Sequence, residues 1–153
     1  LVMDLVRVED AAGIRQSALA IEALIANEVA RGIQPANIVL AGFSQGCAMA
    51  LHTGLRHANK LAGIMALSGY LPLASTLAAE RKPANAATPI FMAHGTQDPV
   101  VPLARAEDTR DALQALGYAV DWNTYPMPHS LHPKEVADIG AFLRKVLAQK
   151  STA

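Results

Sequence analysis

The stretch Ile38-Val39-Leu40-Ala41-Gly42-Phe43-Ser44-Gln45-Gly46 joins an unbroken apolar run to a serine that is flanked by glycines. A continuous apolar run, without alternation of polar residues, is typical of a strand buried on both faces of a parallel sheet. The residues that follow fit a helix from about Gln45 to His57. The stretch therefore predicts a strand, a sharp turn that carries Ser44, and a helix, which is a unit of an α/β fold.

The same alternation of strands and helices continues along the chain. Apolar runs predict strands at residues 63–67, 90–93 and 120–125, and helical periodicity predicts helices at 103–116 and 133–148. Upstream, a long amphipathic helix is expected over residues 10–31, with Asp10 as N-cap and Gly32 closing it. Its apolar face is formed by Ile14, Ala18, Ile21, Leu24, Ile25 and Val29. Residues 71–88, which contain two prolines, are expected to form a loop with one short helix. The pattern predicts a mostly parallel sheet with helices on both faces.

Composition restricts the class of partner. The chain has 153 residues and is 52% hydrophobic, which suffices for one domain with its own core. Its 13 basic and 13 acidic residues cancel and form no runs, so no charge pattern indicates nucleic acid or an anionic membrane. No apolar stretch approaches the roughly 20 residues that span a bilayer. A small, nearly neutral molecule is the expected partner.

The one cysteine, Cys47, cannot form an internal disulfide and offers no metal-binding spacing. We therefore expect no metal and no cofactor, and the cysteine usage fits a cytoplasmic protein.

The turn around Ser44 matches the pattern G-x-S-x-G in the setting that this pattern requires. A nucleophile on a strand-to-helix turn adopts a strained backbone, and Gly42 and Gly46 would leave room for the chain to fold back. The turn would raise the Ser44 hydroxyl above the carboxyl edge of the sheet, where the Gln45 backbone N–H could hold an oxyanion. The alternative is a turn between glycines with an incidental serine.

A serine nucleophile needs a base that is itself oriented by a carboxylate. Asp98 follows the strand predicted at residues 90–93, although an Asp before Pro99 is also a common turn former. His129 follows the next predicted strand, in the loop Pro126-Met127-Pro128-His129-Ser130. The chain order Ser, Asp, His is the order expected for this fold, so the three residues form a candidate triad.

Other residues compete for these roles. His132 precedes Pro133 and fits a helix-entry residue better than a base, although it stays an alternative. We interpret His94 as structural, and His52 and His57 as residues of a polar helix surface. Cys47 is expected to pack as a small apolar group.

Four segments in order resemble the bacterial carboxylesterases related to acyl-protein thioesterases and lysophospholipases. They are G-F-S-Q-G at residues 42–46, L-S-G-Y-L-P at 67–72, H-G-T-Q-D-P-V-V-P at 94–102 and Y-P-M-P-H-S at 125–130. The resemblance implies an α/β-hydrolase fold, with Ser44, Asp98 and His129 as the triad. It also implies esters or thioesters of short to medium acyl chains as substrates. The loop around Leu71 and Leu73 would border the acyl pocket.

The chain departs from the family pattern in three places. It has Cys47 and Pro128 where family members usually carry glycine. It also lacks a match to the H-G-x-G loop and to the first strands of the family, so we expect residues 1–153 to form the C-terminal part of a single catalytic domain, truncated at its N-terminal side. The strand at residues 38–41 would then be an exposed apolar sheet edge, prone to pair with other chains, unless a preceding segment or another chain covers it. Without the second oxyanion donor, the rate would fall on the order of a hundredfold to a thousandfold.

The sequence favours a serine carboxylesterase that acts through an acyl-serine. Two alternatives remain open: a catalytically impaired fragment that self-associates through an exposed sheet edge, and a dienelactone-hydrolase-type or peptidase-type α/β-hydrolase.

Overall fold

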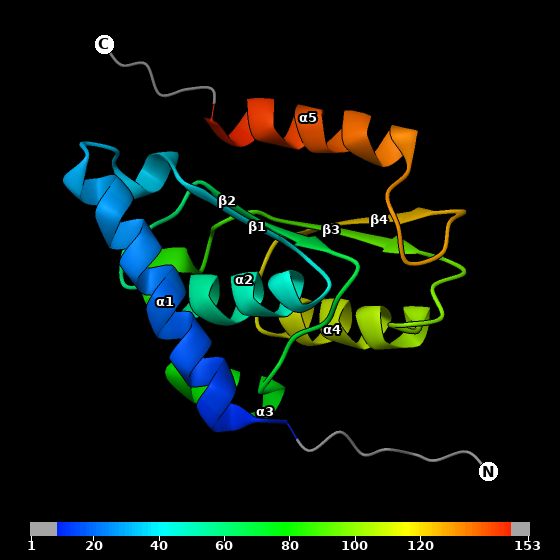
Figure 1. The fold of residues 1–153 in the computed structure, drawn as a ribbon, viewed down its shortest axis with the longest axis horizontal. Helices are drawn as coiled ribbons and strands as arrows, with labels where there is room; N and C mark the ends of the chain where they lie inside the picture. Colours follow the sequence, from blue (N-terminus) through cyan, green and yellow to red (C-terminus); the bar gives the residue numbers. More distant parts are fainter. Residues whose placement is uncertain (1–8, 148–153) are drawn as a thin grey trace.

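A computed structural model describes residues 9–147 of the chain. Its four strands form a parallel sheet in which the spatial order equals the chain order. The strands are β1 (Val39–Phe43), β2 (Gly63–Leu67), β3 (Ile90–Gly95) and β4 (Val120–Tyr125). In the register, Val39 lies beside Gly63 and Ile90 lies beside both Ile64 and Val120. Because all strands run in one direction, the segments that follow them gather at one edge of the sheet (Figure 1).

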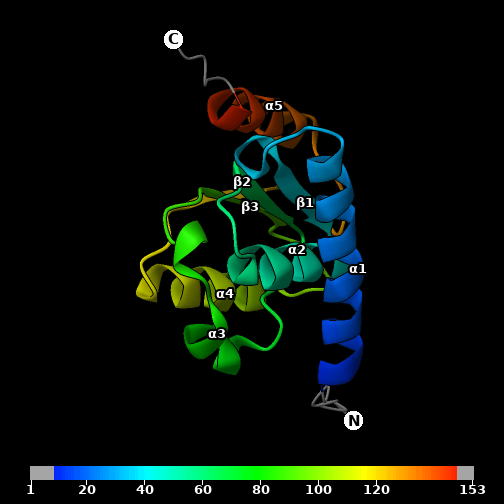
Figure 2. The ribbon, with the colours of Figure 1, turned by 90° about the vertical axis from the view of Figure 1, so that its left-hand side faces the viewer.

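Helices cover both faces of this sheet. Figure 1 shows α2 (Gln45–Arg56) and α4 (Leu103–Ala115) on one face and α5 (Pro133–Leu147) on the other. The long helix α1 (Ala11–Ala30) packs against α2 and stands beside β1, as the turned view in Figure 2 shows. Shorter pieces are α3 (Ala74–Glu80) and the 3₁₀ turns η1 (Pro35–Asn37) and η2 (Pro83–Asn85). None of the described helices is long and apolar enough to cross a membrane.

The core has one apolar cluster on each face of the sheet. Leu51 and Leu55 of α2 and Leu113 of α4 pack over one face, and Phe142 and Val146 of α5 pack over the other. Every residue of β2 and β3 is buried. Because both faces of these central strands are buried, their sequences are continuously apolar and do not alternate between apolar and polar residues.

The predicted order of elements is confirmed, and most boundaries agree within two residues. β3 is two residues longer than predicted and therefore includes His94. The predicted loop at residues 71–88 contains α3 and η2. The predicted end of the last helix, residue 148, lies outside the described residues. Asp10 caps α1 as expected, because its carboxylate accepts a hydrogen bond from the Gly13 N–H at 2.9 Å.

The expected burial of the first strand on both faces is wrong for the described part of the chain. β1 is half-buried or exposed along its length, because β2 lies on one side and no described strand lies on the other. The apolar face of α1 is similarly open: only Ile25 is buried, whereas Leu24 is 64% exposed. Together α1, β1 and the first turns of α2 form a groove of about 350 Å³, which we call the β1 groove. It is lined by Ile21, Leu24, Ile25, Glu28, Ile38, Val39, Leu40, Ala41, Gly46, Met49 and Ala50.

The interpretation of His52 and His57 as surface residues is also wrong. Both side chains are buried, because α1 and α3 cover this side of α2. His57 Nδ1 lies 2.8 Å from a carboxylate oxygen of Glu22 on α1. Burial, followed by the positive charges of Arg56 and Arg15, lowers the pKa of His52 to about 4.

Candidate active site

Ser44 occupies the turn between β1 and α2 in a strained conformation. Its φ of 59° and ψ of −115° are unusual for a residue with a side chain. Its N–H donates to the Leu67 carbonyl at 2.9 Å, which anchors the turn to β2. Strain that the surrounding structure maintains is a common feature of functional sites.

The two glycines around Ser44 differ in what surrounds them. A Cβ at Gly42 would overlap the carbonyl oxygen of Gly46, so Gly42 is needed for the chain to fold back on itself. A Cβ at Gly46 would meet no described atom within 4 Å, because Gly46 faces the β1 groove. The crowding expected on both sides of the serine is therefore found at Gly42 alone.

Gln45 is the first residue of α2, directly after Ser44. The first N–H groups of a helix have no partner within the helix, and they lie at the positive end of its dipole. The Gln45 N–H is thus available to an oxygen that carries negative charge beside Ser44.

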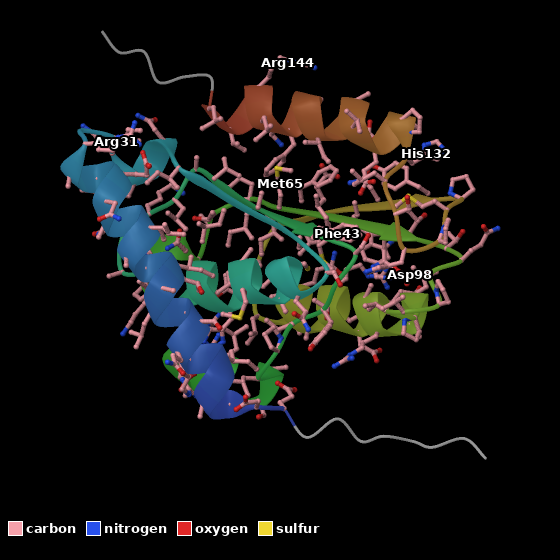
Figure 3. All side chains as sticks on the ribbon, in the orientation of Figure 1. Arg31, Phe43, Met65, Asp98, His132 and Arg144 are labelled. Carbon is pink, nitrogen blue, oxygen red and sulfur yellow. The ribbon has the colours of Figure 1, made fainter. Side chains whose placement is uncertain are left out.

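The structure brings together the three residues of the candidate triad from three separate loops. His129 Nε2 lies 3.0 Å from Ser44 Oγ, and His129 Nδ1 lies 2.7 Å from Asp98 Oδ2. A carboxylate only accepts hydrogen bonds, so Nδ1 carries the proton and Nε2 is left free to accept from the serine hydroxyl. Figure 3 shows Phe43 and Asp98 at the same end of the sheet, and the Phe43 ring lies 4.8 Å from the His129 ring.

Asp98 is held in its ionised form by the loop around it. Burial opposes ionisation, but hydrogen bonds from the Val101 N–H, from His129 and from the Val100 N–H outweigh it, so the pKa of Asp98 is lowered. Both backbone N–H groups donate to Oδ1 at 2.8 Å, which leaves Oδ2 for His129. The carboxylate can therefore orient the imidazole without competing for its proton.

The loops that carry the acid and the base are joined directly to each other. The Thr96 N–H donates to the Tyr125 carbonyl at 2.9 Å, and the Gln97 N–H donates to the Met127 carbonyl at 3.1 Å. A Cβ at Gly95 would overlap the carbonyl oxygens of Met127 and of the next residue, Pro128. The absence of a side chain at Gly95 thus lets the His129 loop lie close to the Asp98 loop.

His94, interpreted from the sequence as structural, contacts the loop that holds Asp98. Its Nε2 lies 2.7 Å from the Val101 carbonyl oxygen and 3.5 Å from Asp98 Oδ2. It fixes the far end of the turn whose N–H groups bind Asp98. The spacing of four residues between His94 and Asp98, both at a strand end, was the signal in the sequence.

The remaining competitors have surroundings that do not suit a catalytic base or nucleophile. His132 precedes α5: its Nδ1 accepts from the Lys134 N–H at 3.1 Å, and its own N–H donates to Glu135. Cys47 is fully buried, and burial raises the pKa of its thiol to about 12. A thiol in this environment stays protonated and is a poor nucleophile.

A hollow of about 380 Å³ opens beside Gln45. It is lined by Glu9, Asp10, Gly13, Ile14, Ser17, Gln45, Ala48, Met49, Tyr70, Pro72 and Arg105. The two residues expected near an acyl pocket, Leu71 and Leu73, flank Pro72 in the sequence but do not line the hollow: Leu71 is buried, and Leu73 is half-buried before α3. Tyr70 and Pro72 of this loop and Arg105 on α4 line the hollow, and none of them was predicted from the sequence as a lining residue; the assignment of the loop to an acyl pocket stays a prediction.

No group of three or more His, Cys, Asp or Glu side chains within residues 9–147 is arranged to hold a metal ion. The described site offers an acceptor nitrogen beside a hydroxyl, an oriented imidazole and a helix N–H.

A strained serine turn after a strand, with an acid and a histidine following the next strands, defines an α/β-hydrolase. The chain belongs to the Phospholipase/Carboxylesterase family, whose model matches residues 3–147.

Comparisons with individual proteins agree with this family. The chain is 47% identical to acyl-protein thioesterase 1 of Gibberella zeae, over 96% of this chain and 64% of that protein. It is 48% identical to acyl-protein thioesterase 1 of Neurospora crassa, over 92% of this chain and 59% of that protein. The chain thus spans less than two thirds of the length of these fungal relatives.

Solved structures show the same fold. Arabidopsis thaliana SOBER1 matches with a TM-score of 0.86 and 29% identity, over 90% of this chain and 66% of that one. Esterase PE8 matches with a TM-score of 0.82 and 34% identity, over 89% of this chain and 63% of that one.

Proposed function

We propose that this protein is a serine hydrolase that cleaves carboxylic esters or thioesters of short to medium acyl chains. The observation that carries the proposal is the continuous chain of hydrogen-bond contacts from Ser44 through His129 to Asp98. The names of the relatives, acyl-protein thioesterase and esterase, support the same class of reaction.

In the proposed reaction, His129 Nε2 takes the proton of Ser44 as the hydroxyl oxygen attacks the substrate carbonyl. Negative charge develops on the carbonyl oxygen, where the Gln45 N–H stabilises it. The imidazolium, held by Asp98, then protonates the departing alcohol or thiol, and an acyl-serine remains. Water, deprotonated by the same nitrogen, attacks the acyl-serine and releases the carboxylic acid and the free hydroxyl.

The test is a kinetic comparison of Ser44→Ala, Asp98→Asn and the wild type on short-chain 4-nitrophenyl esters. Ser44→Ala should lower kcat on the order of a millionfold, as loss of the nucleophile does in other serine hydrolases. Asp98→Asn should lower it on the order of ten-thousandfold, because the imidazole loses its preferred tautomer. Ser75→Ala, which alters an exposed serine on α3, is the matched control and should leave kcat unchanged.

Ester hydrolysis that survives in Ser44→Ala would refute the assignment of the nucleophile. A panel that adds thioesters, lactones and peptides would separate an esterase from a thioesterase, a dienelactone-hydrolase type and a peptidase.

We further propose that this chain self-associates through the β1 groove. An edge strand with unpaired N–H and C=O groups beside exposed apolar side chains is a template for pairing with another strand. Leu24, with 64% of its surface exposed, and the open edge of β1 support this proposal. We also keep a cytoplasmic location as a proposal, based on the single, buried Cys47.

A further inference from the structure

The hollow beside Gln45 combines apolar walls with one cation. Ile14, Ala48 and Met49 supply apolar surface, and Arg105 reaches the hollow from the first turn of α4. The Arg105 guanidinium lies over the Tyr70 ring, with its central carbon 3.6 Å from the ring centroid. Stacking on the aromatic face holds the plane of the guanidinium in position. The N–H groups at the edge of this plane then remain free to donate hydrogen bonds.

These donors distinguish Arg105 from most other arginines of the described chain. Arg15, Arg31, Arg56, Arg81 and Arg110 each donate to a carboxylate, hydroxyl or carbonyl oxygen of the protein. Within residues 9–147, the guanidinium groups of Arg105 and of Arg144 on α5 have no such hydrogen-bond or ion-pair partner. Arg105 is therefore the described arginine with unused donors that lines the hollow at Gln45, the residue that follows the proposed nucleophile.

The two carboxylates that line the same hollow are already engaged by backbone N–H groups. Asp10 accepts from the Gly13 N–H at the start of α1, and Glu9 accepts from the Leu73 N–H before α3. They hold local structure in place and do not neutralise Arg105 at ion-pair distance. Their charge repels an anion throughout the hollow, and the guanidinium of Arg105 is the group in the lining that offsets this repulsion.

We propose that Arg105 is a specificity-determining residue that binds a carboxylate carried by the substrate, with its guanidinium held in position by Tyr70. The substrate is then an ester or thioester whose portion in the hollow has an apolar segment ending in a carboxylate. The apolar walls hold the segment, and the edge of the guanidinium binds both carboxylate oxygens in the geometry that arginine favours. This inference rests on the proposed hydrolase function, and its test is designed so that either can fail alone.

The kinetic test compares paired substrates that differ in one charge. One series consists of 4-nitrophenyl monoesters of succinic, adipic and suberic acids, paired with their terminal carboxamides. A second series places the charge on the alcohol, with the acetate ester of 4-hydroxybenzoate paired with that of 4-hydroxybenzamide. The wild type should prefer the carboxylate in at least one series, and Arg105→Gln should lower kcat/KM for it about tenfold, the value of one charge-assisted contact, with little change for the carboxamide.

Arg110→Gln is the matched control, because Arg110 lies on the same helix and also stacks on an aromatic ring, that of Trp122. It should retain the full preference for the carboxylate. A ratio of carboxylate to carboxamide that Arg105→Gln leaves unchanged in both series would overturn the proposal.

Binding provides a second measurement that needs no turnover. Calorimetry of adipic acid monoamide against adipamide should show tighter binding of the monoamide to the wild type and loss of this difference in Arg105→Gln. If no ester or thioester is hydrolysed, the proposed function fails, whereas the calorimetry still decides whether Arg105 binds carboxylates. Equal binding of the two compounds to the wild type would refute the assignment of Arg105.

Discussion

The two sides of the sheet hold their parts of the candidate site in different ways. On the β4 side, Asp98 and His129 lie on loops joined by backbone hydrogen bonds and by the close approach at Gly95. On the β1 side, Ser44 follows a strand that has β2 as its only described neighbour and an open apolar groove beside it. The acid and the base are thus positioned by contacts within the described chain. The strand before the nucleophile, in contrast, is paired on one side only among the described strands.

The outer strands differ in composition as well. β4 presents Asp121 and Asn123, and Arg110 lies over the Trp122 ring, so polar and charged groups accompany this edge. β1 presents Val39, Leu40 and Ala41. Polar and charged residues on an edge strand discourage pairing with other strands, and apolar ones do not. The difference indicates that β4 is adapted to be an edge and that β1 is adapted to have a neighbour.

Among the changes that test this comparison of the two sides, the largest effect is expected from a side chain placed between the acid and base loops. Gly95→Ala would push the Met127 and Pro128 carbonyls outward and move His129, which follows them, away from Ser44. A displacement of about 1 Å at a catalytic group can cost about a hundredfold in rate. We therefore expect kcat on a short-chain ester to fall by about that factor, measured beside a thermal melt to confirm that the protein is folded.

The control for this variant is Thr96→Ala, which keeps the backbone hydrogen bond to Tyr125 and removes only a long side-chain contact of 3.4 Å. Its kcat should be close to that of the wild type. A folded Gly95→Ala protein with full activity would show that the His129 loop does not depend on this close approach.

The fold and the convergence of the three candidate triad residues could be predicted because they follow from chain order. Parallel strands bring their carboxyl ends to one edge, so Ser44, Asp98 and His129 converge once each is placed after its strand. Burial of His52 and His57 could not be predicted, because it depends on how α1 and α3 cover α2. Arg105 was missed for the same reason: its relation to Tyr70 arises from the packing of α4 against a loop far away in the sequence.

An intermediate effect is expected from the β1 groove. Leu24→Lys places a charge on a side chain that lines the groove and is 64% exposed, so it should weaken self-association without loss of core packing. Leu19 on the same helix is 71% exposed but does not line the groove, which makes Leu19→Lys a matched control. Sedimentation velocity over a range of concentrations should show fewer oligomers for Leu24→Lys only.

Equal behaviour of both lysine variants would show that the groove is not the contact surface. A wild type that stays monomeric at high concentration would exclude this mode of self-association altogether.

The smallest effect concerns how α1 is attached on the β1 side. Few of its side chains are buried, and polar contacts join it to the rest of the protein. Glu80 at the end of α3 binds Arg15 of α1 at 2.9 Å and Arg56 of α2 at 2.8 Å. These hydrogen bonds from Arg15 and then Arg56 lower the pKa of Glu80 to about 2 from its ordinary value of 4.5.

A carboxylate whose pKa is lowered by folding stabilises the folded state above its ordinary pKa, and this contribution is lost as the pH falls through the lowered value. Glu80→Gln should therefore lower the Tm slightly near pH 7, with a difference from the wild type that narrows from about pH 4.5 to about pH 2. His52 also titrates in this range, but the charge of Glu80 is the smallest of the causes that shift the pKa of His52, so this titration differs little between the two proteins. Glu28→Gln, which removes an ion pair with Arg31 at the C-cap of α1, is the control and should show a smaller difference, since this pair connects no other helix to α1. If the Glu80→Gln difference persisted unchanged at low pH, the charge of Glu80 would not be what holds α1 to α2 and α3.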